Sequence, residues 1–134
     1  MTIEKCKGLL FLGLVSIFFS CQSAQKAVDQ KWDEVMELHD ITMPMSSDIN
    51  REVRRLKKLA IVSPDSLQIS EAIKELQYAD EQMWRWMNNI KQPISLLDSL
   101  GQQGAIQYLN EMQIEMGSIS KLMTTSLENS KDYK

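Results

Sequence analysis

From residue 25 onward, apolar and small residues recur at alternating steps of four and three positions, a spacing that places them on one face of a helix. No stretch alternates apolar with polar residues as a half-buried strand does. The first run keeps the spacing without a slip through Val28, Trp32, Val35, His39, Thr42, Ser46, Ile49, Val53, Leu56 and Ala60. The spacing predicts an all-α fold whose first helix covers about residues 24–62.

Prolines indicate where this first helix bends and where the second begins. Pro44 removes one backbone hydrogen bond from the first run without shifting its register, which predicts a kink rather than an end. Ser63 and Pro64 have the residue types of an N-cap and a first helical position. A second helix is therefore expected over residues 64–91.

The later part of the chain carries two further stripes. The second stripe comprises Ile69, Ile73, Leu76, Asp80, Met83, Met87 and Ile90, with Trp84 and Trp86 beside it. After a short helical stub closed by Gly101, the third stripe comprises Ala105, Leu109, Met112, Met116, Ile119, Met123 and Leu127, which predicts a third helix over 102–127. Short connections favour antiparallel neighbours, so we expect an up-down-up three-helix bundle over 24–131. A long coiled-coil hairpin or dimer is the alternative.

Composition limits the chemistry that such a bundle can perform. A chain of 134 residues has room for one small domain. One histidine and two cysteines exclude a multi-ligand zinc site and a disulfide scaffold. A net charge of −3 gives nucleic acid no electrostatic reason to bind.

Residues 1–20 have the pattern of a secretory signal peptide. Two lysines precede an apolar run at 8–19, which is too short to span a bilayer. The segment Phe18-Phe19-Ser20-Cys21 resembles a bacterial lipobox. The resemblance implies cleavage before Cys21 and a diacylglyceryl thioether on its sulfur. An ordinary cleaved signal and an uncleaved anchor are the alternatives.

Lipidation would determine where the protein resides. Cys21 would be the acylated first residue of the mature chain, and residues 21–31 would form a stalk between the lipid and the bundle. We expect an envelope lipoprotein held by fatty-acyl chains such as palmitate, at the outer membrane and facing the periplasm. Because Cys6 leaves with the signal and Cys21 is capped, thiolate chemistry is excluded.

One helical face carries the residues most suited to a metal. Met36, His39 and Met43 share that face, and an antiparallel turn near Ser63 would bring Met83 and Met87 to the same level. Thioethers and an imidazole suit Cu(I), and a His/Met pair suits haem b. Methionine is also a common core filler, and packing without any cofactor is the interpretation we prefer.

Polar residues on the stripes suggest a second role for the core. Asp80 lies level with Ser46, and together with His39 these residues would fix the register of the helices. A polar pocket that exchanges protons or binds a ligand is the alternative. No phosphate loop, nucleophile elbow or paired-carboxylate motif is present, so we expect no enzyme activity.

A basic run at 51–58 follows the same helix. The antiparallel register predicts that Arg51 lies beside Glu75 and Arg55 beside Glu71, which makes the run a partly paired, solvated surface. A docking patch for an anionic partner is the alternative.

Two segments carry a family resemblance. The stretch 35–45 (VMELHDITMPM) resembles an HDxxMPxM signature of small lipoproteins in Bacteroidota-type bacteria, although Met45 follows Pro44 directly. The stretch 79–87 (ADEQMWRWM), followed by Pro93, resembles the ADxxMxxWM signature of the same group. Some members are labelled "viral A-type inclusion protein". The resemblance implies a helical lipoprotein of uncharacterised role and supplies no catalytic residues.

These observations predict a membrane-anchored envelope lipoprotein that acts as a non-catalytic helical binding or scaffold module with an envelope protein as its partner. A periplasmic lipoprotein that binds Cu(I) or haem b through its His/Met layer is the alternative.

Overall fold

The computed structural model describes the backbone of residues 4–134 and the side chains of residues 22–134. It contains four helices, α1 (Glu4–Thr42), α2 (Pro44–Ala60), α3 (Ser66–Asn89) and α4 (Pro93–Ser130), and no strand within that range. The predicted all-α class is confirmed. The predicted signal peptide at 1–20 and the side chain of Cys21 lie outside the described side chains.

The chain divides into two compact units. The first unit contains the residues up to Asp33 together with Lys91–Leu109, and the second contains Glu34–Ile90 together with Asn110–Lys134. Helices α1 and α4 each contribute residues to both units. Every candidate site residue except Cys21 belongs to the second unit. Within the residues whose side chains are described, no helix is long and apolar enough to cross a membrane.

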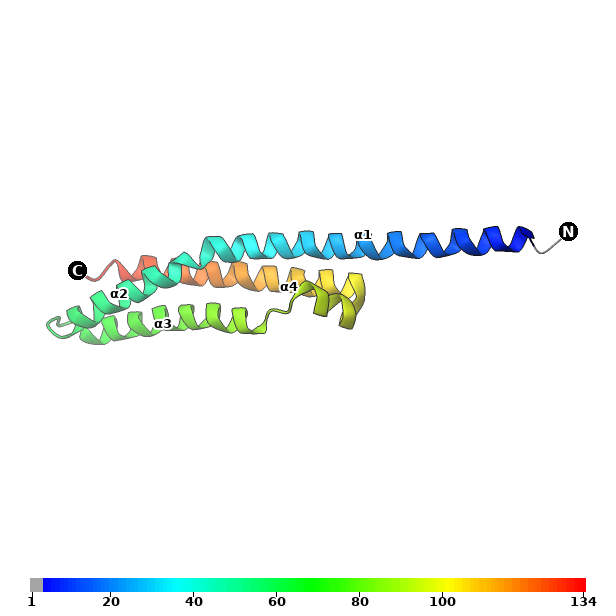
Figure 1. Cartoon of the computed structure of the whole chain (residues 1–134). Coiled ribbons are helices and arrows are strands. Elements are labelled where there is room, and N and C mark those ends of the chain that lie inside the picture. The colour runs from blue at the N-terminus through cyan, green and yellow to red at the C-terminus, as the bar shows by residue number, and fades with distance from the viewer. Residues whose placement is uncertain (1–3) are drawn as a thin grey trace. The chain divides into compact units, whose positions relative to one another are not determined.

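In the second unit, α2 and α3 run side by side in opposite directions, joined by the turn at 61–65 (Figure 1). The C-terminal part of α4 again runs in the direction of α2, so the predicted up-down-up order holds within this unit. The apolar core comprises Val35, Ile49, Val53, Leu56, Ile69, Ala72, Leu76, Ala79, Met83, Trp86, Met116, Ile119 and Met123. All the second-unit members of the first predicted stripe except Ala60 are buried.

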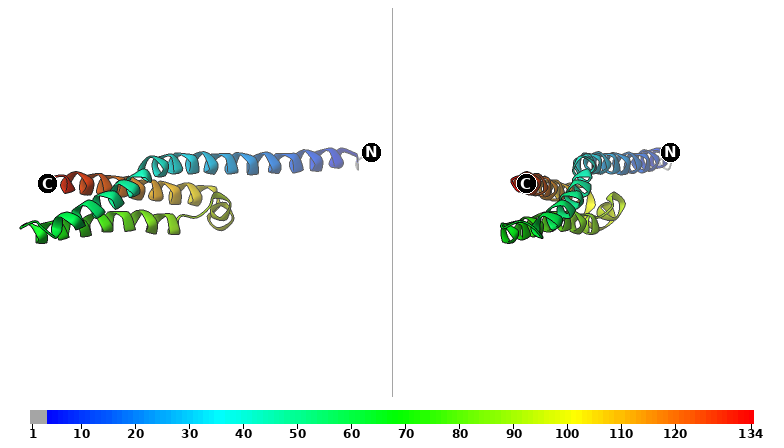
Figure 2. Two further views of the ribbon diagram at one scale, coloured as in Figure 1. Left: turned by 60° about the vertical axis from the view of Figure 1, so that its left-hand side comes forward. Right: turned by 90° about the vertical axis from the view of Figure 1, so that its left-hand side faces the viewer.

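The predicted kink at Pro44 is confirmed. Helix α1 ends at Thr42 and α2 begins at Pro44, yet Met43 between them keeps helical torsion angles (φ −54°, ψ −36°). The N–H of Met43 still donates to the carbonyl of His39 at 2.7 Å. Since proline has no N–H to continue this ladder, the helix changes direction here, as Figure 2 shows.

The second helix begins later than predicted. It starts at Ser66 after Asp65, whose N–H donates to the hydroxyl oxygen of Ser63 at 3.2 Å. Ser63 therefore caps a turn and not the helix, and the expected start at Pro64 was wrong. The hydroxyl provides the chain with a local alternative to the helical hydrogen bond.

The residue at which the predicted stub meets the third helix, Gly101, lies in the first unit. Helix α4 is labelled from Pro93, but the non-helical backbone at Gly101 divides it into a short first segment and a long second one, which agrees with the predicted stub closed by Gly101 and the helix that follows it. Gly101 has φ 69° and ψ 178°, a conformation that only glycine adopts readily. The buried apolar residues of this unit are Val28, Leu96, Ala105 and Leu109.

Candidate functional site

The best-defined side-chain cluster of the second unit centres on His39 and Trp86. The two rings are stacked with centroids 5.7 Å apart and an interplanar angle of 16°. Both side chains are buried, and the indole N–H of Trp86 donates to the carbonyl of Met112 at 3.0 Å. This layer therefore joins α1, α3 and α4.

The buried face of α3 coincides with the predicted stripe at every second position and lies one residue earlier at the positions between. It carries Ile69, Ala72, Leu76, Ala79, Met83 and Trp86, whereas Asp80 and Met87 are only partly buried. Both rows fit a four–three spacing, so the periodicity alone does not choose between them. The observed row buries a large indole and leaves a carboxylate at the edge, which avoids the cost of an enclosed charge.

His39 has one ring nitrogen bonded and the other unpartnered. Its Nδ1–H donates to Oδ1 of Asp40 at 2.9 Å, because an ionised carboxylate can only accept. Its Nε2 is buried without a hydrogen-bond partner among the described residues. In the neutral ring this nitrogen carries a lone pair. A carboxylate on one nitrogen and a lone pair on the other is also the arrangement of a metal-ligating histidine.

The methionines of the predicted metal set are not equally enclosed. Met83 is fully buried, whereas Met36, Met43 and Met87 are partly exposed. No group of three or more His, Cys, Asp or Glu side chains gathers anywhere in the part of the chain with described side chains. The thioether ligand set therefore stays a prediction.

No hydrogen bond joins Ser46 and Asp80 among the described residues, so the polar register expected of these residues and His39 stays a prediction. Ser46 is buried, but its hydroxyl has no partner among the described residues. The side-chain amide of Asn50 donates to the carbonyl of Ser46 at 2.8 Å and not to Asp80. One carboxylate oxygen of Asp80 is likewise buried without a partner.

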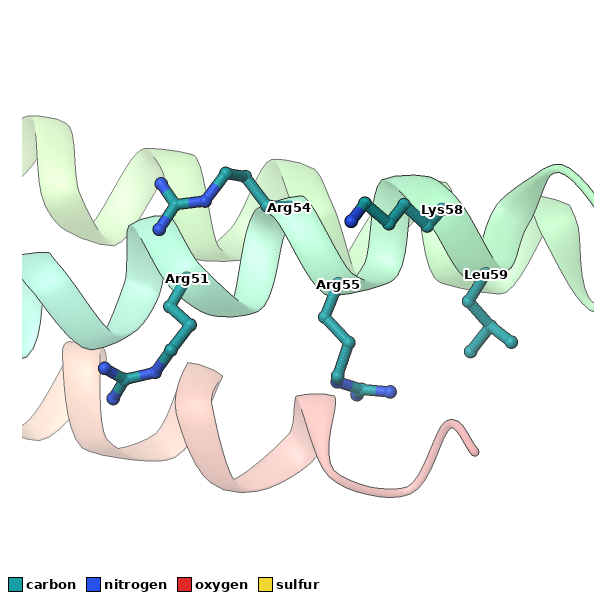
Figure 3. A pocket seen from close by; sticks show the side chains of 5 residues that line it. All are labelled: Arg51, Arg54, Arg55, Lys58 and Leu59. Carbon is teal, nitrogen blue, oxygen red and sulfur yellow. The ribbon is translucent and has the colours of Figure 1, made fainter.

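The outer surface of α2 forms a cationic face of Arg51, Arg54, Arg55 and Lys58, which line a shallow hollow beside Leu59 (Figure 3). The expected pairs across to α3 are wrong. Arg51 pairs with Asp48 and Arg55 with Glu52, both within α2. An acid three positions away on the same helix lies within reach of a long arginine side chain, and here it is preferred to the acids of α3.

Arg55 also ties α2 to the end of the chain. Its guanidinium donates to the carbonyls of Ser130 at 3.1 Å and Tyr133 at 2.9 Å, while Glu52 accepts from the hydroxyl of Ser130 at 3.0 Å. The hydrogen bond from Arg55 is the main cause that lowers the pKa of Glu52 below its ordinary value of 4.5. The same bond raises the pKa of Arg55. No pattern in the sequence predicted these contacts between α2 and residues 130–133.

Replacing Glu52 with glutamine should destabilise the protein in a pH-dependent way. A carboxylate with a lowered pKa stabilises the fold above pH 4.5, and this contribution is lost as the pH falls through the folded-state pKa. Because Arg55 is 41% exposed, the loss near neutral pH should be only about 1 kcal/mol. Urea unfolding at a series of pH values measures it.

A matched control for this prediction is Glu71→Gln. Glu71 pairs with Lys74, and both side chains are well exposed. We expect a change of a few tenths of a kcal/mol for this variant at any pH. Equal losses in the two variants, or a Glu52→Gln loss that persists in acid, would contradict the assignment.

Comparison of the chain with protein-family models, curated proteins and solved structures gives no match.

Proposed function

We propose that the protein is a lipid-anchored, non-catalytic module of the bacterial envelope that binds an anionic partner protein through the cationic face of α2. The observation that carries the proposal is that two cations of this face are exposed and unpaired. Arg54 and Lys58 have no acidic partner among the described residues, and both are exposed. Unpaired cations at one site attract a negatively charged surface and steer its approach.

Exposed apolar residues in and after the turn that follows α2 support the same proposal. Ile61 and Val62 in the turn after α2 are 82% and 80% exposed, and Leu67 at the start of α3 is 79% exposed. We call these three residues the apolar turn. Exposed aliphatic side chains next to charged ones are typical of protein-binding surfaces. The lipobox-like segment ending at Cys21 supports attachment to a membrane.

Experiments in living bacteria test the two parts of this proposal: lipid labelling and membrane sedimentation test the anchor, and cross-linking tests the partner. The full chain should incorporate labelled palmitate and sediment with membranes, and Cys21→Ser should do neither. In the lipidated protein, Arg54→Glu combined with Lys58→Glu should weaken a cross-link to an acidic envelope protein about tenfold or more.

The control for the second part is Lys121→Glu, which reverses the charge of an exposed lysine on α4. It should leave the cross-link intact. Palmitate on the Cys21→Ser variant would contradict the anchor. A cross-link that survives reversal of Arg54 and Lys58, or is lost equally with Lys121→Glu, would contradict the cationic face as the binding surface.

The unpartnered Nε2 of His39 favours a second candidate, a Cu(I) or haem b site in the same unit. Adding Cu(I) under anaerobic reductant should then stabilise the Cys21→Ser protein by about 2.7 kcal/mol at a hundredfold excess over the dissociation constant. His39→Leu should keep its fold and lose this gain. Thermal melts measure the shift, and a haem titration followed by absorbance tests the other cofactor. Identical melts with and without Cu(I), together with a flat titration, would rule this candidate out.

A further inference from the structure

A groove runs between α2 and α3 in the second unit, away from the His39–Trp86 layer. Its volume is about 300 Å³, near the lower limit for sites that hold small molecules. Ile49 and Val53 form apolar parts of its lining. Asp80 and Trp84 line it from α3, and Asn50 lines it from α2. The groove thus combines an aliphatic surface, an aromatic ring and a carboxylate.

Of the two carboxylates that line this groove, Asp80 is the one without a partner among the described residues. One oxygen of its carboxylate is buried and accepts no hydrogen bond from any described residue. The neighbouring carboxylate of Glu81 differs, because it accepts two hydrogen bonds from Arg85, at 3.1 and 2.7 Å. A carboxylate that has no cationic partner among the described residues attracts a cationic ligand, which supplies the missing counter-charge.

Trp84 supplies the second requirement of a cation site. It is 47% exposed, whereas Trp86 two residues later is 1% exposed. The face of an indole ring attracts a cation, and this attraction adds to that of a nearby carboxylate. The two side chains are four positions apart on α3, and this spacing places them on the same helical face.

We propose that this groove binds a primary alkyl ammonium group, as carried by a lysine side chain or a free diamine. The ammonium pairs with the carboxylate of Asp80 beside the ring of Trp84, and the aliphatic stem lies along the groove between α2 and α3. An ammonium offers three donors on a narrow chain, which suits a groove of this volume. The inference does not depend on lipidation or on the cationic face.

Nuclear magnetic resonance of the full chain in a nonionic detergent tests this site. The probes are cadaverine and a blocked lysine, and the neutral control is the blocked lysine acetylated on its side-chain nitrogen. The indole N–H resonance of Trp84 should shift with saturation on adding either amine. The indole resonance of Trp86, whose N–H is bonded to Met112, should stay in place.

Variants separate this site from general attraction of amines to an acidic protein. Asp80→Asn, followed through the indole resonance of Trp84, and Trp84→Leu, followed through the backbone amide resonance of Asp80, should each weaken binding about tenfold or more. Glu71→Gln removes the same charge from α3 outside the groove and should change affinity less than about twofold. A lysine peptide that binds more tightly than cadaverine identifies a protein as the source of the amine, and the reverse order identifies a free diamine.

Three outcomes would overturn the proposal. The first is a Trp84 resonance that does not move with either amine. The second is equal binding of the acetylated control, because a neutral amide lacks the charge that the site requires. The third is equal weakening by Asp80→Asn and Glu71→Gln, which would mean that the net charge of the protein attracts the amine.

Discussion

Replacing Trp86 with alanine is expected to lower the free energy of unfolding by about 3–5 kcal/mol. The indole is 1% exposed, so its removal leaves a cavity among α1, α3 and α4. The substitution also removes the stacking partner of His39 and the donor to the carbonyl of Met112. Urea unfolding followed by circular dichroism measures the loss.

The same helix provides a matched control for this prediction. Trp84 is the same residue type two positions earlier, but it is 47% exposed. Trp84→Ala should cost less than about 1 kcal/mol. Trp86→Phe separates the hydrogen bond from the packing, and we expect it to cost about 1–2 kcal/mol, between the two alanine variants. Equal losses for Trp84→Ala and Trp86→Ala would mean that the layer is not the centre of the core.

The second large effect is expected at Gly101, where alanine should destabilise the protein by about 1–3 kcal/mol. The backbone there has φ 69° and ψ 178°, which strains any residue with a Cβ atom. A Cβ added at this position would meet no atom within 4 Å, so the cost comes from the backbone and not from a clash. Thermal unfolding, together with hydrogen exchange at 93–105, measures the change.

Gly117 is the control because alanine should have the opposite effect there. This glycine lies within α4 without a positive φ, and a Cβ atom would meet nothing within 4 Å. Gly117→Ala should therefore stabilise the protein by about 0.5–1 kcal/mol. The prediction for Gly101 is wrong if both variants change stability in the same direction.

Periodicity predicted the helices and the register of the second unit closely. The turn expected near Ser63 placed residue 87 level with His39, and Trp86 is the residue that stacks there. The error of one residue arises because α3 carries two rows with the same spacing. A hydrophobic pattern records which positions could share a face, whereas the volumes of Trp86 and Ala79 and the charge of Asp80 decide which row is buried.

The ion pairs made by the side chains could not be predicted from the sequence. Helix register placed Arg51 and Arg55 opposite acids of α3, but both pair with acids on α2 itself. Long flexible side chains choose among several acids at similar distances, and spacing along the chain does not rank those choices. The unpartnered atoms of His39 and Asp80 depend on rotamers in the same way, so neither the lone Nε2 nor the groove was predictable.

Trp84 and Trp86 differ so much in exposure that their fluorescence can report separately on the groove and on the core. A buried indole stacked on imidazole emits at shorter wavelength than one that is half in water, so the two signals separate on the emission axis. Loss of the blue component follows disassembly of the core. Iodide should quench the longer-wavelength emission of Trp84, and a ligand bound in the groove should reduce this quenching, so the quenching reports whether the groove is open. With the third tryptophan removed by Trp32→Phe, one spectrum thus distinguishes a variant that fails to fold from one that folds but no longer binds.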